Sequence, residues 1–278
     1  MQEIECGLRF ELNDDNKTGK VVSSPQVSGH IVIPKIVSNG GREYIITSIG
    51  REAFLHNQDI IDIDFPENSE VKTIYPRAFA FSSLRKISFP GSLVDLKDGC
   101  FEKADKLSSF MISPTNLAFE FIENKYLINV TKGRELVFAK RDIKDADIPA
   151  DITRIGNRAF AHCDNLKTVH FETIGCQIKE IGKKAFFRCK NLQTISYFPE
   201  SIKKFGSRCF EGSEQLVSVE FRAEKVTLKF RCFYKCKNLA LALFPNAKEV
   251  DLGKNVFTGV SDHFLKQLST PGAVTKEI

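Results

Sequence analysis

The sequence predicts a repeat protein of the mainly β or α/β class, a right-handed solenoid whose coils stack around a parallel β-sheet. Three observations lead to this fold. The 278 residues include 24 Phe and 5 Tyr but no Trp, which indicates that phenylalanine fills one structural slot many times. Eight of these phenylalanines end a short motif that mostly returns about every 24 residues. A strand-like run follows most copies of the motif.

The composition excludes several classes of protein. With 42% hydrophobic and 27% charged residues, the chain has the balance of a soluble, folded protein. No stretch approaches about eighteen apolar residues, so we expect no transmembrane helix. The first six residues carry acidic side chains and no apolar core, so we expect no signal peptide, and an exported form would need its leader removed or another route. The net charge of +5 is too small to predict a nucleic-acid partner.

The repeated motif has the form Ile-Gly-x-x-Ala-Phe. Clear copies occupy residues 49–54, 155–160, 181–186, 205–210 and 252–257, and looser copies end at Phe79, Phe101 and Phe233. Successive terminal phenylalanines are separated by 25, 22, 59, 26, 24, 23 and 24 residues. The one long interval, from Phe101 to Phe160, predicts a coil that carries an insertion. Regular spacing at this period is typical of a solenoid.

A strand is predicted downstream of the motif. The runs at 166–171, 192–197 and 216–221 begin with Leu and place apolar residues at their first, fourth and sixth positions. After the first turn this alternation is that of a strand with one buried face. One such strand per coil is the pattern of leucine-rich repeats. Because a repeat of this size cannot bury its apolar face alone, neighbouring coils must stack.

Close stacking explains two further positions of the motif. The residue before each terminal Phe is always Ala, Cys or Val, because stacked coils lie about 4.8 Å apart and a bulky side chain would clash there. The phenylalanine rings should then form a stack, each ring burying on the order of 150–250 Å². The glycine after Ile, as at Gly156 and Gly182, is expected to provide a positive φ where the chain turns a corner.

The full pattern resembles the BspA-like leucine-rich-repeat family. The family motif matches most fully over residues 152–192, and the resemblance extends over roughly residues 27–260. It includes a run-in segment at 29–34 and 40–50. Three repeats depart from the motif, with Tyr75, Lys97 and Lys229 where Gly is usual. The resemblance implies a solenoid that binds a partner and performs no catalysis.

The chain is expected to divide into five segments: an N-terminal β cap at 1–47, repeats at 48–112, a β-hairpin island at 113–148, repeats at 149–260, and a C-terminal helix with a mobile tail at 261–278. In the cap, residues 7–12 and 20–23 form a hairpin. In the island, strands at 117–122 and 126–129 flank a turn. Residues 261–268 have an N-cap side chain and helical spacing, which predicts the C-terminal helix.

The cysteines are predicted to be free thiols in the core. Six of the eight occupy repeat slots: Cys100, Cys163, Cys189, Cys209, Cys232 and Cys236. Cysteine in such slots behaves as a small apolar residue. Equivalent slots on neighbouring coils, as for Cys163 with Cys189 and Cys209 with Cys232, leave a disulfide geometrically conceivable. The remaining two, Cys6 and Cys176, are expected to be the accessible thiols.

No pattern of catalytic or metal-binding residues stands out. The five His are scattered without a repeated metal spacing, and there is no Cys-x-x-Cys pair. Neither a Gly-x-Ser-x-Gly elbow nor a Gly-x-Gly-x-x-Gly loop occurs. The sequence therefore predicts no enzyme, no cofactor and no metal site.

A strand-face row is the first candidate surface for a partner. It takes the positions two and four after the first apolar residue of each strand run. Its proposed contact residues are Lys86, Ser88, Thr168, His170, Thr194, Ser196, Ser218 and Glu220, and the same positions hold Asp62, Asp64, Ser109, Met111, Leu241 and Leu243. The Ser and Thr side chains suit hydrogen bonds to a protein or glycan, while the lack of large anchors favours weak or multivalent binding. The C-terminal helix is expected to cover Leu241 and Leu243.

A basic row is the second candidate surface. Two residues before the terminal Phe stand Arg77, Arg158, Lys184, Arg208 and Arg231. Like charges on adjacent coils repel by about 1 kcal/mol per close pair in water, and solubility alone is better served by mixed signs. The row is either a solvated face or a surface for an anionic partner, such as a sulfated glycan, an acidic protein or a phosphate-rich surface.

Two functions follow from these features. The family resemblance implies a non-catalytic binding module for adhesion or recognition at a cell surface, with a protein or glycan ligand. The alternative is an intracellular leucine-rich-repeat scaffold for protein–protein interaction. The missing signal peptide and the free thiols favour this cytoplasmic alternative.

Overall fold

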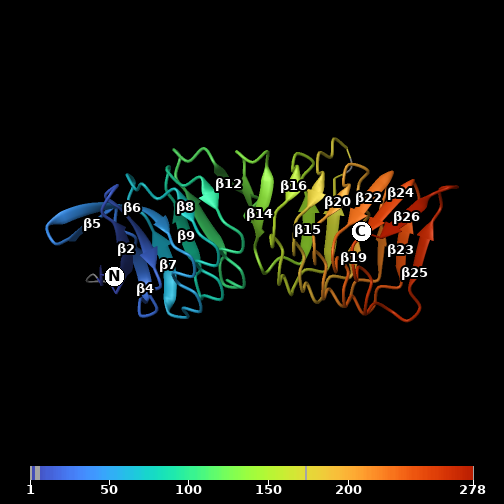
Figure 1. Ribbon diagram of the computed structural model, residues 1–278, viewed down its shortest axis with the longest axis horizontal. Coiled ribbons are helices and arrows are strands. Elements are labelled where there is room, and N and C mark those ends of the chain that lie inside the picture. The colour runs from blue at the N-terminus through green and yellow to red at the C-terminus, as the bar shows by residue number, and fades with distance from the viewer. Residues whose placement is uncertain (1, 4–6, 173, 278) are drawn as a thin grey trace. The chain divides into compact units, whose positions relative to one another are not determined.

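The computed structural model describes residues 2–3, 7–172 and 174–277 and forms two compact units, Met1–Thr131 and Lys132–Ile278. Every regular element in these described ranges is a β-strand (Figure 1). Parallel strands from successive coils pair side by side in both units, so the predicted parallel solenoid is confirmed. The protein is therefore mainly β and not α/β.

The first unit begins with the predicted hairpin. Strands β2 (Arg9–Asn13) and β3 (Thr18–Val22) pair antiparallel, and β1 (Gln2–Glu3) adds to β2. A second hairpin, which the sequence did not predict, joins β5 (Ile36–Asn39) to β6 (Arg42–Ile49). Strand β3 pairs in parallel with β6, so the hairpin continues into the first coil of the solenoid.

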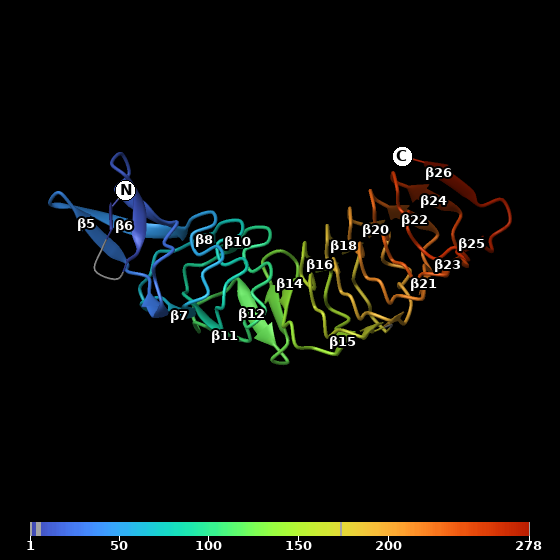
Figure 2. The same cartoon turned by 90° about the horizontal axis from the view of Figure 1, so that it is seen from below.

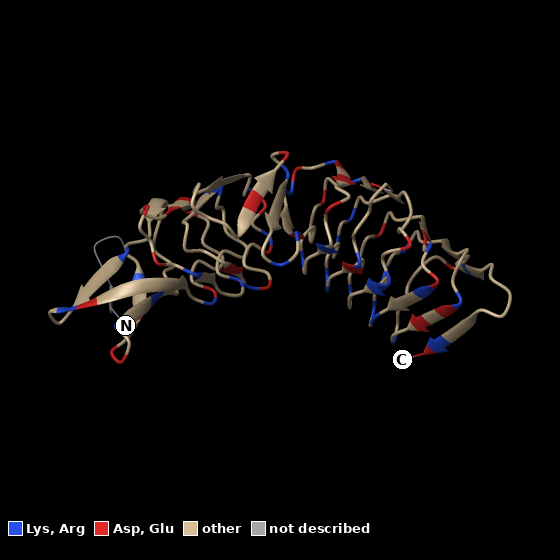
Figure 3. Cartoon of the chain, turned by 90° about the horizontal axis from the view of Figure 1, so that it is seen from above, with Lys and Arg blue, Asp and Glu red and all other residues tan. Residues whose placement is uncertain are grey.

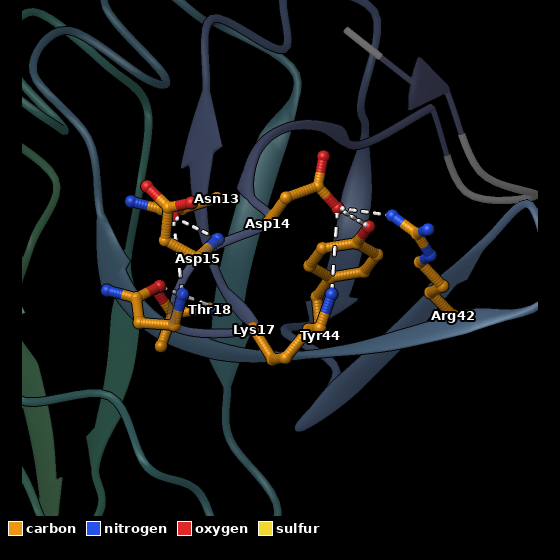
Figure 4. A network of polar contacts seen from close by, with 8 residues as sticks. Asn13, Asp14, Asp15, Lys17, Thr18, Arg42 and Tyr44 are labelled. Atoms are coloured by element: carbon orange, nitrogen blue, oxygen red, sulfur yellow. Dashed lines mark hydrogen bonds and ion pairs between the residues drawn. The ribbon is translucent and has the colours of Figure 1, made fainter.

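A polar network ties the two hairpins together (Figure 4). The Tyr44 hydroxyl donates to Asp14 Oδ1 at 2.5 Å, and Arg42 Nη1 donates to the same oxygen at 3.2 Å. Lys17 Nζ lies 3.8 Å from it. The hydrogen bond from Tyr44 is the main reason that the pKa of the Asp14 carboxyl lies below its ordinary value. The network fixes the turn of the first hairpin against the second.

Each coil of the first unit contributes strands to two parallel rows. One row continues from β6 through β8 (Thr73–Ile74) to β10 (Asp95–Leu96). The other runs through β4 (Gly29–Val32), β7 (Ile60–Asp64), β9 (Lys86–Phe89) and β11 (Ser109–Ile112). The unit ends with the predicted antiparallel hairpin of β12 (Phe119–Ile122) and β13 (Tyr126–Asn129).

The second unit repeats the two-row plan, which Figure 2 shows from the side. The first row runs through β14 (Glu135–Ala139), β16 (Arg154–Ile155), β18 (Glu180–Ile181), β20 (Lys204–Phe205), β22 (Lys225–Leu228), β24 (Glu249–Leu252) and β26 (Val274–Glu277). The second row contains β15 (Asp145–Ile148), β17 (Thr168–Phe171), β19 (Thr194–Ile195), β21 (Ser218–Glu220), β23 (Leu241–Phe244) and β25 (Leu265–Leu268).

The predicted island at 113–148 is wrong in its second half. Strand β14 pairs in parallel with β16, and β15 pairs in parallel with β17, so residues 135–148 form a coil of the solenoid. This coil lacks the terminal Phe. Instead the buried Arg141 guanidinium lies 4.4 Å from the Phe138 ring centre and donates to the Ala159 carbonyl at 2.9 Å. Because the terminal Phe was the residue that identified each coil, this coil was not recognised from the sequence.

The phenylalanine slots form the core, as predicted. In the first unit the Phe54 and Phe79 ring centres lie 5.1 Å apart at an interplanar angle of 6°. In the second unit the stack continues over Phe160, Phe186, Phe210, Phe233 and Phe257. The Phe210 and Phe233 rings are 5.0 Å apart and only 1° from parallel. These parallel rings lock each coil to the next.

The glycine after Ile does not adopt the positive φ that we expected. Of the five motif glycines, including Gly182 and Gly206, none is among the positive-φ residues that the structure describes. The reason for glycine is space: a Cβ on Gly206 would lie 2.5 Å from the Gly182 carbonyl carbon, and one on Gly50 would lie 2.5 Å from the Val21 oxygen. The coils approach most closely at this point, and any side chain would push them apart.

The predicted C-terminal helix is also wrong. Ser261 caps only a turn, in which its Oγ accepts from the His263 amide at 3.2 Å. Residues Leu265–Leu268 then form β25, paired with β23, and Val274–Glu277 form β26 where a mobile tail was expected. The backbone N–H and C=O groups along the open edge of the preceding coil need hydrogen-bond partners. A strand that pairs in parallel supplies them, whereas a helix would not. Leu241 and Leu243 therefore lie beside β25 and are half-buried rather than covered by a helix.

Candidate functional site

The basic row lies on the corner turns that lead into the phenylalanine slots. All five residues have left-handed backbone conformations, with φ of 59° at Arg77, 58° at Arg158, 56° at Lys184, 60° at Arg208 and 54° at Arg231. Such values are uncommon for residues other than glycine. In the second unit the backbone amide of each of the four row residues also donates to a carbonyl of the next coil, as Arg208 N does to Phe230 O at 2.8 Å. These bonds hold the strained corner in place.

The backbone of this corner does not itself require a positive charge. Glu52 and Asn255 occupy the same position in other coils, with φ of 58° and 60°. An acidic and a neutral side chain thus fit the same conformation. The choice of Arg or Lys in the remaining coils therefore concerns the side chain and what surrounds it.

The structure divides the basic row between the two units. Arg77 is in the first unit, where its Nη1 forms an ion pair with Glu52 Oε1 at 2.9 Å. The other four members are in the second unit, on four consecutive coils. Among these, Arg208 Nε lies 3.5 Å from Glu211 Oε2. Four of the five cations of the row therefore lie at the same corner of four consecutive coils in the second unit.

Aromatic rings lie between the cations of the second unit. Lys184 Nζ is 4.8 Å from the centre of the Phe187 ring. The Arg231 guanidinium lies 4.9 Å from the Phe230 ring and 4.6 Å from the Tyr234 ring. The negative face of an aromatic ring attracts a cation, so these contacts hold the charged groups at the surface in fixed positions. The sequence analysis did not anticipate this interleaving, although Phe187 and Tyr234 each follow a terminal Phe directly.

The strand-face row follows the second row of strands in each unit. In the first unit, Lys86 and Ser88 lie on β9 with Asp62 paired to Lys86 in the register. Ser88 Oγ accepts from the Phe65 amide at 3.1 Å, so this hydroxyl already takes part in the fold. His30 on β4 lies 3.8 Å from Asp62 and 3.6 Å from Asp64, a cluster that the sequence did not reveal.

In the second unit, parallel pairing brings the predicted strand-face residues together. Thr168 pairs with Thr194 in the register, and Asp145 precedes them on β15, where its carboxylate accepts from Thr168 Oγ1 at 2.6 Å. His170 is exposed and Ser196 is half-buried. Further along, Ser218 and Glu220 lie on β21 and pair with β23. The side chains on this face are mostly small and polar, and some of them already hydrogen-bond to one another.

A stacked pair stands at the edge of this face. Arg222 Nε donates to Glu220 Oε1 at 2.7 Å, and its guanidinium lies 3.4 Å from the centre of the Tyr197 ring. The bond to Glu220 is the main reason that the pKa of Arg222 is raised. Sequence reasoning missed this pair because Tyr197 and Arg222 come from different coils.

A third charged feature, the charge ladder, lies along the opposite row of strands. It consists of Glu135, Arg154, Glu180, Lys204, Lys225, Glu249, Asp251 and Lys276 on β14 to β26. The sign changes from each strand to the next except from β20 to β22, and Figure 3 shows blue and red segments following one another there. Arg154 forms ion pairs with Glu135 and, at 3.5 Å, with Glu180. The ladder neutralises itself within the protein.

A family model described as "BspA type Leucine rich repeat region (6 copies)" matches residues 42–132 and 131–263. The chain belongs to the BspA-type leucine-rich-repeat family. A comparison with curated proteins gave no match.

Two solved structures share the fold of this BspA-type chain. A leucine-rich repeat protein from Eubacterium ventriosum ATCC 27560 is 20% identical, with a TM-score of 0.61 over 95% of this chain and 84% of that one. A leucine rich cell surface protein from Faecalibacterium prausnitzii A2-165 is 17% identical, with a TM-score of 0.55 over 100% of this chain and 94% of that one. At this level of identity the likeness concerns the fold alone.

The thiols of the BspA-type repeat are part of its core. The seven described cysteines are free, and all but Cys176 are buried. Burial is the main reason that the pKa values of the Cys100, Cys189 and Cys236 thiols lie well above the ordinary range. Cys176 is half-buried, and Cys6 lies outside the described residues.

Neither a metal site nor a membrane-spanning helix is found in the described part of the chain. No group of three or more His, Cys, Asp or Glu side chains there is arranged to hold a metal ion. No helix in the same residues is long and apolar enough to cross a bilayer.

Proposed function

We propose that this BspA-type protein is a non-catalytic binding module for adhesion or recognition at a cell surface, and that the basic row of the second unit contacts an anionic ligand. The observation that carries the proposal is the contrast between two charged features of the same coils. The charge ladder pairs opposite signs and neutralises itself. The basic row instead places Arg158, Lys184, Arg208 and Arg231 on consecutive coils.

The spacing of the basic row suits an extended polyanion. Consecutive coils lie about 4.8 Å apart, so four cations span roughly 14 Å. A chain with regularly spaced anionic groups, such as a sulfated glycan, could contact several of them at once. Its charges would also relieve the mutual repulsion of the row, which amounts to about 1 kcal/mol per close pair in water.

The strand face offers a second, weaker contact surface. Its Thr and Ser side chains in the second unit, such as Thr194 and Ser218, are exposed and uncharged. They suit hydrogen bonds to a protein or glycan, and the Tyr197–Arg222 stack supplies the kind of anchor that interfaces favour. We propose that this face adds contacts to a ligand held mainly by charge.

The cell-surface assignment rests on the family and on one structural relative. The similar protein from Faecalibacterium prausnitzii is described as a leucine rich cell surface protein. A surface protein with a mildly basic charge would meet sulfated or phosphorylated polymers there. This similarity supports the proposed location.

Heparin chromatography at increasing salt tests the proposal. The Lys184→Glu/Arg208→Glu variant should lose retention, and wild-type retention should fall steeply as ionic strength rises, because salt screens exposed charges. The protein should still fold, because Glu52 shows that glutamate fits this backbone position, and the melting midpoint should fall modestly because Arg208→Glu replaces the ion pair with Glu211 by two carboxylates. As a matched control, Lys179→Glu/Lys203→Glu makes the same charge change at exposed sites outside the row. Equal retention of wild type and the row variant would reduce the row to a solvated face.

A second candidate function is an intracellular scaffold for protein–protein interaction. The observation in its favour is the set of free, buried thiols, including Cys209 and Cys232, whose Sγ atoms lie 3.0 Å apart without a bond. Exported proteins more often carry such pairs as disulfides. Thiol labelling of freshly purified, denatured protein separates the cases: eight reactive thiols favour the scaffold, whereas a Cys209–Cys232 disulfide found by mass spectrometry favours export.

A further inference from the structure

We infer that a hollow beside the basic row binds a single tetrahedral oxyanion, a sulfate ester or phosphate monoester, between Arg188 and Lys235 and above Gly212. We call it the Gly212 hollow, and its volume is about 470 Å³. The inference deepens the proposed function, on which it rests for the anionic class of the ligand. It adds a defined site for one charged group to a surface that otherwise attracts a polymer by its overall charge.

The hollow arises from an alternation along one column of the second unit. The residues two positions after the terminal Phe are His162, Arg188, Gly212, Lys235 and Gly259. All five have positive φ, at 61°, 56°, 75°, 57° and 74°. A cationic side chain and a glycine therefore alternate from Arg188 onwards, and each glycine leaves a gap beside a long side chain.

The backbone does not explain the two glycines. His162, Arg188 and Lys235 adopt the same left-handed conformation with full side chains, so this corner accepts residues other than glycine. What glycine provides is room. A Cβ on Gly212 would lie 3.2 Å from Arg188 Cγ, and one on Gly259 would lie 3.5 Å from Lys235 Cγ. The stem of each cation thus lies against the glycine of the following coil.

The charges around the hollow leave an excess of cations. Glu214 is paired with Lys237 at 3.0 Å, and Glu211 faces Arg208 at 3.5 Å. Over the described residues, no carboxylate lies within ion-pair distance of Arg188, Lys190 or Lys235. Three lining cations are therefore without a counter-charge while both lining carboxylates have one.

Aromatic rings hold two of these cations at the rim. The Arg188 guanidinium lies 5.3 Å from the Phe187 ring centre, whose ring also contacts Lys184 of the basic row. Lys235 Nζ lies 5.4 Å from the Tyr234 ring centre, whose ring also contacts Arg231. Each ring is shared between one cation of the row and one of the hollow. A ligand lying along the row would bring its charged groups to the hollow.

The chemistry of the lining selects the ligand class. A guanidinium donates two parallel hydrogen bonds to the oxygens of a sulfate or phosphate group, and an ammonium adds a compact charge. Arg188 and Lys235 come from coils two apart, about 10 Å along the stack, and Gly212, against which the Arg188 stem lies, is between them. An oxyanion seated over Gly212 would be flanked by both.

The test is a titration of the full chain, followed by the NMR shifts of the Gly212 and Gly259 amides. The probes are glucose 6-sulfate and glucose 6-phosphate, with glucose as the uncharged control. We expect the anionic sugars to shift both amides and glucose to shift neither. Binding of only one anionic sugar would identify which ester the site takes. Equal shifts with glucose, or no saturable shift with any probe, would overturn the inference.

Two variants test the residues by different means. Arg188→Gln/Lys235→Gln removes the flanking charges and should weaken binding roughly tenfold or more. Gly212→Asn fills the gap with a residue that tolerates positive φ, and it should weaken binding while leaving every charge in place. The control Lys179→Gln/Lys203→Gln should leave binding within about twofold of wild type after the small loss of net charge. Unchanged affinity in both hollow variants would overturn the inference.

The two proposals can fail separately. Heparin retention reports on the basic row, and the sugar titration reports on the Gly212 hollow. Loss of heparin retention in the row variant together with no sugar binding would leave the proposed function standing and remove the hollow. Saturable sugar binding with no heparin retention would leave the hollow standing and remove the basic row as a surface for a polyanion.

Discussion

The charge ladder and the basic row of the second unit are built on the same coils and follow opposite rules. In the ladder, Arg154 lies between Glu135 and Glu180, so its charge is compensated on both sides. In the row, Lys184 and Arg231 have aromatic rings beside them. Both features sit where the backbone tolerates several residue types. Under the proposed function, charge in the ladder stabilises the fold and charge in the row serves a partner.

The same coils also show what holds them together independently of charge. Directly after each cation of the row comes a small buried residue and then a stacked phenylalanine, as in Lys184, Ala185 and Phe186. Within one turn, the phenylalanine thus faces the core and the cation two residues before it faces the solvent. If the comparison is right, substitution of the phenylalanine should affect stability, and substitution of the cation should affect binding.

The largest expected effect comes from Phe186→Ala. The side chain is fully buried between Phe160 and Phe210, so its removal should lower the free energy of unfolding by about 3–5 kcal/mol. Lys184→Ala, two residues away, should change it by less than about 1 kcal/mol, since its half-buried side chain is not part of the ring stack and contacts the Phe187 ring at the surface. Denaturant melts of both variants make the comparison. A loss under about 1 kcal/mol for Phe186→Ala would show that the ring is not part of the core.

A smaller effect is expected from a matched pair of glycine substitutions. Gly206→Ala should cost about 1–3 kcal/mol, because its Cβ would lie 2.5 Å from backbone atoms of the neighbouring coil. Gly212→Asn should cost less, because asparagine tolerates the φ of 75° at this position and its Cβ meets the flexible Arg188 stem, with Cγ at 3.2 Å, as its closest contact. Melting curves of the two proteins are sufficient. Equal losses of stability in the two variants would contradict the view that Gly206 is needed for packing between coils and that Gly212 borders a hollow.

The smallest effect concerns the ladder and its dependence on pH. Hydrogen bonds from Lys276 and Lys225 lower the pKa of the Glu249 carboxyl to about 2. Because the folded value is depressed, the stabilisation is complete above the unfolded value of about 4.3 and is lost as the pH falls towards 2. An NMR titration of the side-chain carboxyl should show this, and Lys276→Gln should raise the pKa. An ordinary pKa for Glu249 in the wild type would mean that this part of the ladder is not formed.

Sequence reasoning succeeded where one residue type marks one repeated slot. Phenylalanine revealed the period, and from the period follow the stacked core and the small residue before each ring. It failed for Arg141, because the coil that contains it has no terminal Phe. It also assigned a helix to residues 261–268, where local spacing favoured a helix but parallel pairing with β23 satisfies the backbone better.

The functional surfaces depend on features that the sequence does not display. The ladder needs the register between two-residue strands, such as Arg154 against Glu180, which no local pattern specifies. The basic row was visible from the spacing, but its left-handed backbone was wrongly expected at the glycine two positions earlier. The Gly212 hollow depends on the room that Gly212 leaves beside the Arg188 stem of the neighbouring coil, and this contact can be read only from the folded structure.

One measurement tests most directly whether the basic corner is the binding surface. A sulfated oligosaccharide should be titrated into isotope-labelled protein and the shifted backbone amides mapped onto the fold. The account predicts that the shifts cluster on the corner turns of the second unit, at residues 157–163, 183–190, 207–214 and 230–237, and fade with added salt. Shifts of equal size along the charge ladder, on β16 to β24, would contradict it.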